Sequence, residues 1–361
     1  MSELTPDINL YHKIVELLSA ARQNVVRTVN QTMVYTYYEI GRMIVEDEQH
    51  GKERAEYGKQ VLEDLSLKLS QEFGKGFSIV NLRQMRSFFL AYSIQQKSSA
   101  ELENGKKYEK LSNISSVEKT DISATPLRKF TLSWSHYLKL MRIYNPNERS
   151  FYEIECAANY WSLKELERQF NSALYERLVL SRDKDGVKQL SEIGQVIEKP
   201  LDFLKDPYVL EFLNLPEHHA YSENDLEGEI IDKLEHFLLE LGKGFTFAGR
   251  QVRITFDESH FKADLVFYNR LLKCFVIIDL KIGKLTHQDI GQMQMYVNYY
   301  DRTVKLPDEN KTIGIILCKD KSETLVEFTL PEDNDSIFAS KYQTILPDKQ
   351  DFINLLNQGD V

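Results

Sequence analysis

The spacing of apolar residues divides this chain into two regions. Up to about residue 185 they recur every three or four positions, which indicates amphipathic α-helices. We predict helices over residues 10–48, 57–73, 79–92, 133–144, 147–161 and 162–180. The first region is therefore expected to be entirely helical.

The spacing changes after about residue 200, where alternating or continuous apolar runs indicate strands. We predict strands over residues 244–256, 264–268, 275–281, 311–318 and 324–330, with helices over 225–242 and 286–302. This order predicts a mixed sheet with helices packed on it. The 361 residues suffice for two domains. We therefore predict an α+β protein with an all-α N-terminal domain, residues 1–185, and a C-terminal α/β domain with a mixed central sheet, residues 186–361.

Residues 96–127 fit neither pattern. They are rich in Ser, Lys, Glu and Asn without an apolar period, so we predict a flexible insertion. The apolar runs of the chain are too short to span a bilayer, and its first residues have no signal-peptide pattern. Cys156, Cys274 and Cys318 lack the spacing of a disulfide framework or a zinc site. We expect a cytoplasmic protein that has no membrane partner.

Two of the predicted helices resemble a helix-turn-helix. The helix of residues 79–92 follows the turn GKGF, with Ser78 as a candidate N-cap. Asn81, Arg83 and Gln84 are then candidates to contact nucleic acid. The same pattern fits an ordinary helical hairpin with a solvated polar face, and both interpretations stay open.

The overall charge limits how the chain could bind nucleic acid. Its formal net charge is -10, which argues against a protein that coats nucleic acid through bulk charge. A local basic groove remains compatible with a nucleic-acid substrate. Arg250 and Gln251, on the predicted strand 244–256, are further candidates to contact it.

Two predicted strands carry charged residues where a buried strand normally has apolar ones. Side chains alternate between the faces of a strand, so Asp279 and Lys281 share a face. A hairpin centred on Leu271 and Leu272 pairs Asp264 with Asp279, with about 5 Å between their Cβ atoms. Carboxylates this close raise each other's pKa unless a cation such as a divalent metal lies between them. The alternative is a salt bridge at a strand end, with Asp264 capping a turn.

A third carboxylate is predicted to face the core. The apolar stripe of the helix over 225–242, extended back by one turn, reaches Glu227. Glu229 and Glu240 share the opposite side, which we expect to face solvent. Glu227 is thus a candidate third metal ligand, and its alternative role is a charge in the first turn of the helix.

The helix after the hairpin supplies polar partners, because Gln292 and Tyr296 are four positions apart and share a face. Asp264 and Asp279 would hold Mg²⁺ or Mn²⁺, which lowers the pKa of a bound water. Lys281 would orient that water or stabilise the charge that develops on a phosphate. Gln292 and Tyr296 would position the lysine or the phosphate, which makes these five residues the candidate catalytic set.

The pattern D-(x)14-D-x-K followed by Q-x-x-x-Y resembles the RecB-like branch of the PD-(D/E)XK nuclease superfamily. The segments FLLELGKGFTFAGRQVRI, ADLVFYNRLLKCFVIIDLKIGKLTHQDIGQM and LSWSHYLKLMRI are similar to the YhcG family, which joins a helical N-terminal domain to such a nuclease domain. The resemblance implies a restriction-endonuclease-like fold for residues 186–361, a metal-dependent phosphodiesterase and DNA as substrate class. Ala263 stands where the superfamily name has Pro, and Asp279 replaces the commoner Glu.

Two other functions stay open. The chain could be a DNA-binding or complex-assembly protein that keeps a nuclease fold with a weak or unused site, although the intact D…D-x-K set favours an enzyme. It could also cleave RNA, because no sequence feature separates the two substrates. A homo-oligomer is compatible with the sequence.

Overall fold

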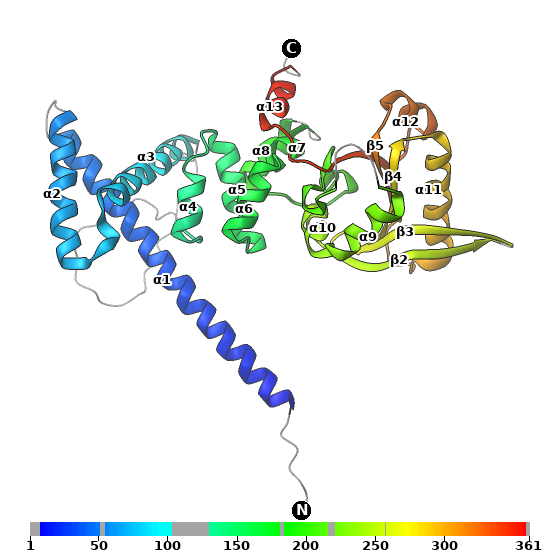
Figure 1. Cartoon of the computed structure of the whole chain (residues 1–361), viewed down its shortest axis with the longest axis horizontal. Coiled ribbons are helices and arrows are strands. Elements are labelled where there is room, and N and C mark those ends of the chain that lie inside the picture. The colour runs from blue at the N-terminus through cyan, green and yellow to red at the C-terminus, as the bar shows by residue number, and fades with distance from the viewer. Residues whose placement is uncertain are drawn as a thin grey trace, which may run out of the picture. The chain divides into compact units, whose positions relative to one another are not determined.

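The computed structural model describes residues 8–50, 55–102, 130–180, 184–215, 221–256 and 258–358. The chain separates into two compact units, Met1–Leu166 and Glu167–Val361. Figure 1 shows the helices of the first unit and the sheet of the second. The domain limits of 1–185 and 186–361 stay predictions, and the two units divide the chain earlier.

The described part of the first unit is helical, as the apolar spacing predicted. Its elements are α1 (Ile8–His50), α2 (Ala55–Phe73), the 3₁₀ turn η1 (Lys75–Phe77), α3 (Ile79–Leu102), α4 (Trp134–Leu140) and α5 (Pro146–Asn159). The hydroxyl of Ser78 accepts a hydrogen bond from the backbone N–H of Asn81 at 3.3 Å, so the predicted N-cap of α3 is confirmed.

The predicted insertion begins later than expected. Helix α3 continues through Leu102, so the expectation of a loop is wrong for residues 96–102. Gln, Lys, Ala, Glu and Leu occur there, and these residues favour a helix even without an apolar period. Residues 103–127 lie outside the described residues.

Aromatic residues form much of the core of the first unit. The centroid of the Phe88 ring on α3 lies 5.0 Å from the centroid of the Phe130 ring and 5.2 Å from that of Tyr137. Helices α1 and α3 approach closely at Gly41, where an added Cβ would collide with the carbonyl oxygen of Met85. Any side chain at position 41 would therefore force these two helices apart.

The second unit is built around one mixed sheet. Strands β1 (Tyr208–Val209), β2 (Phe245–Phe256), β3 (Ser259–Asn269), β4 (Cys274–Lys284), β5 (Ile313–Asp320) and β6 (Ile337–Gln343) lie in the order β1-β6-β5-β4-β3-β2. Strands β2, β3 and β4 are antiparallel, whereas β4, β5, β6 and β1 pair in parallel. The predicted mixed central sheet is confirmed.

The remaining elements of this unit are helices and short turns. They are α6 (Leu163–Asn171), which begins in the first unit, α7 (Leu174–Leu180), α8 (Lys184–Ile193), η2 (Pro200–Asp202), η3 (Glu211–Leu213), α9 (Glu223–Asp232), α10 (Leu234–Leu241), α11 (His287–Tyr299), the π-turn η4 (Tyr300–Val304), α12 (Glu323–Thr329) and α13 (Lys349–Gln358).

Helices cover both faces of the sheet. Leu226 and Phe237, on α9 and α10, share one apolar core with alternate residues of β3, β4 and β5. Met293 on α11 packs on the other face, where Ile277 belongs to the same core. Because Asp279 and Lys281 alternate in step with Ile277, they point toward the α11 face. Helix α11 can lie close to β5 because residue 314 is glycine. A Cβ at this position would lie 2.5 Å from the Met293 side chain.

Three expectations about single elements are wrong. Residues 324–330 were expected to form a strand but lie largely in α12. The hydroxyl of Ser322 caps the N-terminus of this helix. The helix expected over 162–180 breaks at Ala173, whose φ is 53°. The helix expected over 225–242 is divided at Lys233 into α9 and α10. The two helix breaks depend on backbone geometry that apolar spacing does not report.

The break at Lys233 has a consequence for Glu240, which we expected to face solvent. It is fully buried instead. A single continuous helix would keep Glu240 on the same side as Glu229, but the irregular φ of -117° at Lys233 changes the direction in which the second helix presents its side chains. Glu229 remains near the surface and pairs with Lys233 at 3.1 Å.

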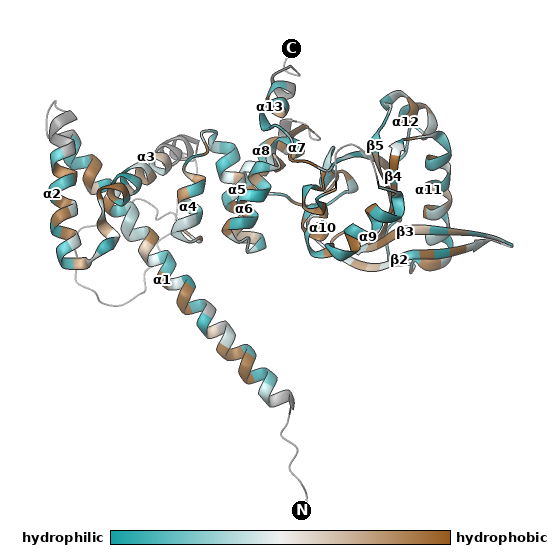
Figure 2. Cartoon of the chain, in the orientation of Figure 1, coloured by the Kyte–Doolittle hydropathy of each residue, from teal (hydrophilic) through white to brown (hydrophobic). Residues whose placement is uncertain are grey.

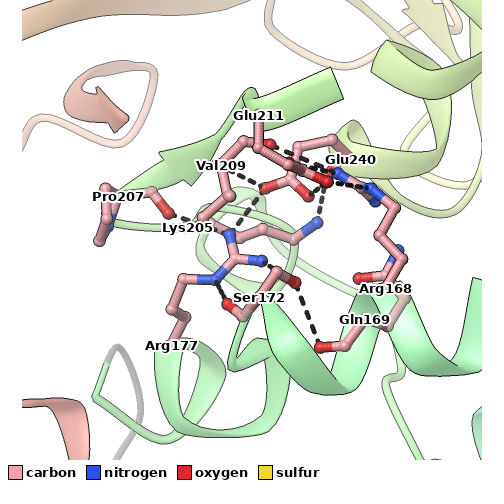
Figure 3. Close-up of polar contacts among 9 residues, drawn as sticks. All are labelled: Arg168, Gln169, Ser172, Arg177, Lys205, Pro207, Val209, Glu211 and Glu240. Atoms are coloured by element: carbon pink, nitrogen blue, oxygen red, sulfur yellow. Dashed lines mark hydrogen bonds and ion pairs between the residues drawn. The ribbon is translucent and has the colours of Figure 1, made fainter. Parts of the chain in front are cut away.

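Glu240 belongs to a buried network of charges (Figure 3). Its Oε1 lies 2.6 Å from Nη1 of the fully buried Arg177, and Lys205 donates to its backbone carbonyl. Arg168 contacts both Glu240 at 3.4 Å and Glu211 at 2.8 Å. Burial by itself raises the pKa of Glu240, but the three cations outweigh it and lower that pKa to about 2.

Candidate active site

The two aspartates meet in the hairpin of β3 and β4. Leu265 pairs with Ile278, and the same register carried one step further sets Asp264 opposite Asp279. The backbone N–H of Leu280 donates a hydrogen bond to Oδ2 of Asp264 at 2.9 Å, so this carboxylate reaches the neighbouring strand. The hairpin register predicted from the sequence is thereby confirmed.

Asp279 lies in an environment that opposes its negative charge. Its residue is 2% exposed. Burial first, and repulsion by Asp264 second, raise the pKa of Asp279 to about 7, against the opposite effect of Lys281. A buried carboxyl with a raised pKa beside a second carboxylate is a feature of functional sites, because such an arrangement does not stabilise a fold by itself.

Lys281 supplies the positive charge of the site. Its Nζ lies 2.9 Å from Oδ2 of Asp279, 3.8 Å from Glu223 and 3.9 Å from Asp289. Burial lowers the pKa of Lys281, but the neighbouring carboxylates Asp279, Glu223 and Asp264 raise it overall. The ammonium group therefore stays charged at neutral pH.

Glu223 and Asp289 were missed by the sequence analysis. Each lies in the first turn of a helix beside the hairpin, in α9 and α11. Both helices begin with a capping box, formed by Ser222 in α9 and by Thr286 in α11. Those two patterns, S-x-x-D and T-x-x-D, were the available signal, because they mark helix starts on either side of the strands.

Gln292 and Tyr296 lie together on α11. The carboxamide of Gln292 donates to the hydroxyl of Tyr296, and that hydroxyl donates to the carbonyl of Lys262 at 2.8 Å. Burial raises the pKa of Tyr296, and the charges of Asp279 and Asp264 raise it further. The tyrosine hydroxyl therefore lies within the field of the two aspartates and joins α11 to β3.

Glu227 lies on the buried side of α9, as predicted, and contacts two residues of β2. Its Oε1 is 3.1 Å from Nε of Arg250, whose side chain is half exposed. The carboxamide of Gln251 donates both to Glu227 and to Oδ1 of Asp264, the latter at 3.1 Å. Gln251 has a φ of 47°, an uncommon backbone conformation for a residue with a side chain.

Gln251 therefore joins two of the three predicted metal ligands. Its φ brings the carboxamide between Glu227 and Asp264 instead of leaving it on the regular strand surface. We expected Arg250 and Gln251 to contact nucleic acid, and that role stays a prediction. The half-exposed guanidinium of Arg250 is the more accessible of the two.

The donors of the site fit a divalent metal that keeps some of its water. Among the described residues, no group of three or more His, Cys, Asp or Glu side chains lies close enough together to hold a metal ion. Asp264 and Asp279 supply two carboxylates, and Mg²⁺ commonly binds one or two together with water and substrate phosphate. Oδ2 of Asp279 is buried and accepts no well-aligned hydrogen bond from the described residues, although Lys281 pairs with it. A ligand role for Glu227 stays a prediction.

The N-terminal candidates lie in the first unit. Arg83 is exposed on α3, whereas Asn81 and Gln84 are half-buried. The side chain of Asn81 donates to the carbonyl of Gly76 at 3.0 Å and so supports the turn before α3. Of the three, Arg83 is the most accessible to a nucleic acid.

Two other observations bear on the sequence expectations. In the parts of the chain that the structure describes, no helix is both long and apolar enough to cross a membrane. Cys156, Cys274 and Cys318 are free thiols and buried. The cytoplasmic location stays a prediction.

A mixed sheet with two aspartates and a lysine at its β3–β4 hairpin defines the class of PD-(D/E)XK nuclease domains. The family pattern described as "YhcG PDDEXK nuclease domain" matches residues 201–357, and that of "DUF1016 N-terminal domain" matches residues 13–177. A protein of Escherichia coli (strain K12) named "Putative nuclease YhcG" is 39% identical over 357 residues, which cover 94% of this chain and 91% of that protein. The chain belongs to the YhcG family.

Solved structures give a more distant likeness. A repair endonuclease from Pyrococcus abyssi is 15% identical, with a TM-score of 0.25 over 36% of this chain and 50% of that one. The apo form of EndoMS is 16% identical, with a TM-score of 0.23 over 36% of this chain and 49% of that one.

Proposed function

We propose that this chain is a metal-dependent nuclease that hydrolyses phosphodiester bonds of DNA. The observation that carries the proposal is the raised pKa of Asp279 beside Asp264, with Lys281 2.9 Å from Asp279. The family supports it, because nucleases of the PDDEXK class generally use divalent metals. Mg²⁺ or Mn²⁺ is the metal we expect, since the donors are carboxylate oxygens.

Each residue of the site has a proposed role. Asp264 and Asp279 would hold the metal, and Glu227 is the proposed third ligand. When bound, the metal would lower the pKa of a water and offset negative charge on the phosphate. Lys281 would orient the attacking water through its ammonium group. Gln292 and Tyr296 would hold α11 against β3 and position the phosphate.

The choice of DNA over RNA and of enzyme over binding protein is open to a direct test. The full-length chain is incubated with plasmid, linear duplex, branched DNA and RNA, each with Mg²⁺, with Mn²⁺ and with EDTA. We expect cleavage of at least one DNA that EDTA abolishes. Binding of DNA without cleavage under any of these conditions would instead favour a nuclease fold used for binding or assembly.

Replacement of Gln292 is expected to have a moderate effect on cleavage. Gln292→Ala removes the donor to Tyr296 but leaves both aspartates and Lys281 in place. We expect metal affinity to be unchanged and the cleavage rate to fall less than the roughly hundredfold typical of losing a group that acts directly on the reaction. Single-turnover cleavage and calorimetry measure the two effects separately. A loss of metal binding would contradict the positioning role.

The first unit is a candidate to bind DNA through α3. In the full-length chain, Arg83→Ala is expected to weaken duplex binding several-fold, because Arg83 is exposed and each phosphate contact contributes to affinity. The slope of log affinity against log salt concentration should decrease in magnitude by about one, which is the share of a single phosphate contact. Fluorescence anisotropy over a range of salt concentrations measures both. Equal affinity and slope would leave the ordinary helical hairpin as the better interpretation.

A further inference from the structure

The N-terminal half of α1 is a helix without a partner in the described residues. From residue 11 to residue 29, every residue whose side chain is described is exposed. Figure 1 shows this half extending past α2, α3 and α4. Its exposed large apolar residues include Ile14, Leu18, Val25, Val26, Val29 and Met33, which lie on one side of the helix and form its exposed stripe. So many exposed apolar residues on one helix mark an interaction surface.

The composition of this segment also requires a packing partner. Val25, Val26, Thr28 and Val29 are β-branched, and such residues lower helix stability. A helix in water draws most of its stability from packing of an apolar face. The hydroxyls of Thr28 and Thr32 each donate to a carbonyl of their own helix, at 2.8 and 2.9 Å, so neither needs water. The segment is therefore suited to burial.

The same unit contains an apolar groove of about 680 Å³ between the C-terminal half of α1, α2 and the start of α3. Its lining includes Thr36, Ile40, Met43 and Asp47 of α1 and the apolar residues Leu65 and Leu69 of α2. Figure 2 shows brown, hydrophobic bands on both halves of α1 and on α2. A groove with this lining fits an amphipathic helix.

The exposed stripe and the groove lie along one face of α1. Val29 precedes Thr36 by seven residues, and Met33 precedes Ile40 by seven. Residues seven apart stay on nearly the same side of a helix, with a drift of about 20°. The stripe cannot fill its own groove, because Leu18 and Ile40 are about 33 Å apart along one continuous helix. A second copy of the chain can fill it.

We infer that two copies of this chain associate through antiparallel α1 helices, each laying its N-terminal half on the groove of the other. Such an interface is isologous, so every contact occurs twice. The antiparallel direction follows from charge. A parallel pair would set Arg22 beside Arg22, whereas an antiparallel pair brings Arg22 toward the acidic end of α1 and aligns the helix dipoles favourably.

Asp47 lies at the centre of that acidic end, between Glu46 and Glu48. Its neighbours Glu46 and Glu48 form ion pairs with Arg42 at 2.8 Å and with Arg86 at 2.7 Å. Asp47 is exposed, lines the groove and has no ion pair among the described residues. It is therefore available to a cation from outside the chain.

Arg22 is the complementary residue on the stripe. It is exposed, precedes Val29 by seven residues and has no ion pair within the part of the chain that the structure describes. Pairing Arg22 of one copy with Asp47 of the other fixes the register of two antiparallel helices. In that register Val29 faces Ile40 and Val26 faces Met43, so apolar residues of the stripe meet the lining of the groove.

Charge exchange tests this register. The mass of the full-length chain is measured by sedimentation equilibrium over a range of concentrations, for the wild type, Arg22→Asp, Asp47→Arg and the double variant. We expect a dimer for the wild type. Each single variant should raise the dissociation constant of the dimer at least tenfold. The reason is that each substitution sets two like charges together, and the symmetry of the dimer makes this happen at two places. The double variant should restore it.

A mixture of the two single variants gives a sharper test. In a mixed dimer each introduced charge meets an opposite one, so Arg22→Asp and Asp47→Arg chains should associate with each other more tightly than either variant associates with itself. Arg27→Asp, on the opposite side of α1, is the control and should leave the wild-type mass unchanged. Circular dichroism verifies that every variant is helical.

Several outcomes would overturn the inference. A wild-type chain that is a monomer at every concentration would exclude a second copy as the occupant. A dimer that neither single variant weakens would place the interface elsewhere. Failure of both the double variant and the mixture to associate would contradict the antiparallel register. These results are independent of cleavage, so they leave the proposed nuclease function untouched.

Discussion

The Asp279→Ala variant is expected to lose both metal binding and cleavage. An oxygen-rich metal site that loses one of two carboxylates loses a ligand and a negative charge together. The fold should survive. Burial and Asp264 raise the pKa of Asp279, so its charge is unfavourable in the folded state, and Lys281 keeps Glu223 and Asp289 within 3.9 Å. Calorimetric metal titration and single-turnover cleavage measure the two losses.

The Lys281→Ala variant is expected to separate these two properties. It removes a positive charge 2.9 Å from Asp279, so metal should bind at least as tightly as in the wild type. Cleavage should fall by ~10² to 10⁴, the range typical of losing one general acid–base or electrostatic group. The contrast between Asp279→Ala and Lys281→Ala therefore distinguishes a metal ligand from a residue that acts on the water.

Asp308→Ala provides the matched control, because Asp308 is an exposed aspartate of the same unit that lies near Tyr268 of β3 and does not belong to the candidate catalytic set. It should bind metal and cleave like the wild type. A wild-type chain that binds no divalent metal, or an Asp279→Ala variant that cleaves as fast as the wild type, would end the nuclease proposal. The chain would then be better described as a binding protein with a nuclease fold.

The hairpin site could be predicted because its information is local. Alternation on β4 fixes the common face of Asp279 and Lys281, and a short connection fixes the register that brings Asp264 beside them. The mixed sheet followed from the order of helices and strands in the same way. Both depend on residues near one another in sequence.

Other parts of the site depend on geometry that the sequence does not display. Gln251 contacts Glu227 and Asp264 from a backbone conformation with a φ of 47°, and nothing in an alternating strand predicts that value. Glu223 approaches Lys281 because α9 and β4 pack in the folded chain, although they are far apart in sequence. Glu240 is buried because the helix breaks at Lys233, where no Pro or Gly marks a break.

The buried network around Glu240 should contribute strongly to stability. Glu240→Gln keeps the shape of the side chain but removes the negative charge that faces Arg177, Lys205 and Arg168. Breaking a buried ion pair by removing one partner costs about 3–5 kcal/mol. Independently, a pKa lowered from its ordinary 4.5 to about 2 corresponds to about 3 kcal/mol of stabilisation.

The same pKa gives the expected pH dependence. A carboxylate whose pKa is lowered by folding stabilises the fold above its unfolded pKa, near 4.5, and this contribution is lost as the pH falls toward 2. The wild type should therefore lose stability over this range, whereas Glu240→Gln, which has no proton to gain there, should lose less. The difference between the two proteins should be largest at neutral pH and should shrink in acid.

Hydrogen exchange followed by mass spectrometry can measure this effect within the second unit. Peptides from α10 and β1 should exchange faster in Glu240→Gln, by a factor that corresponds to the lost free energy. Glu235→Gln is the control, because Glu235 is exposed on the same helix and surface substitutions usually change stability by less than about 0.5 kcal/mol. Equal protection of these peptides in Glu240→Gln and Glu235→Gln would mean that the cations are satisfied without Glu240 and that the network contributes little to the fold.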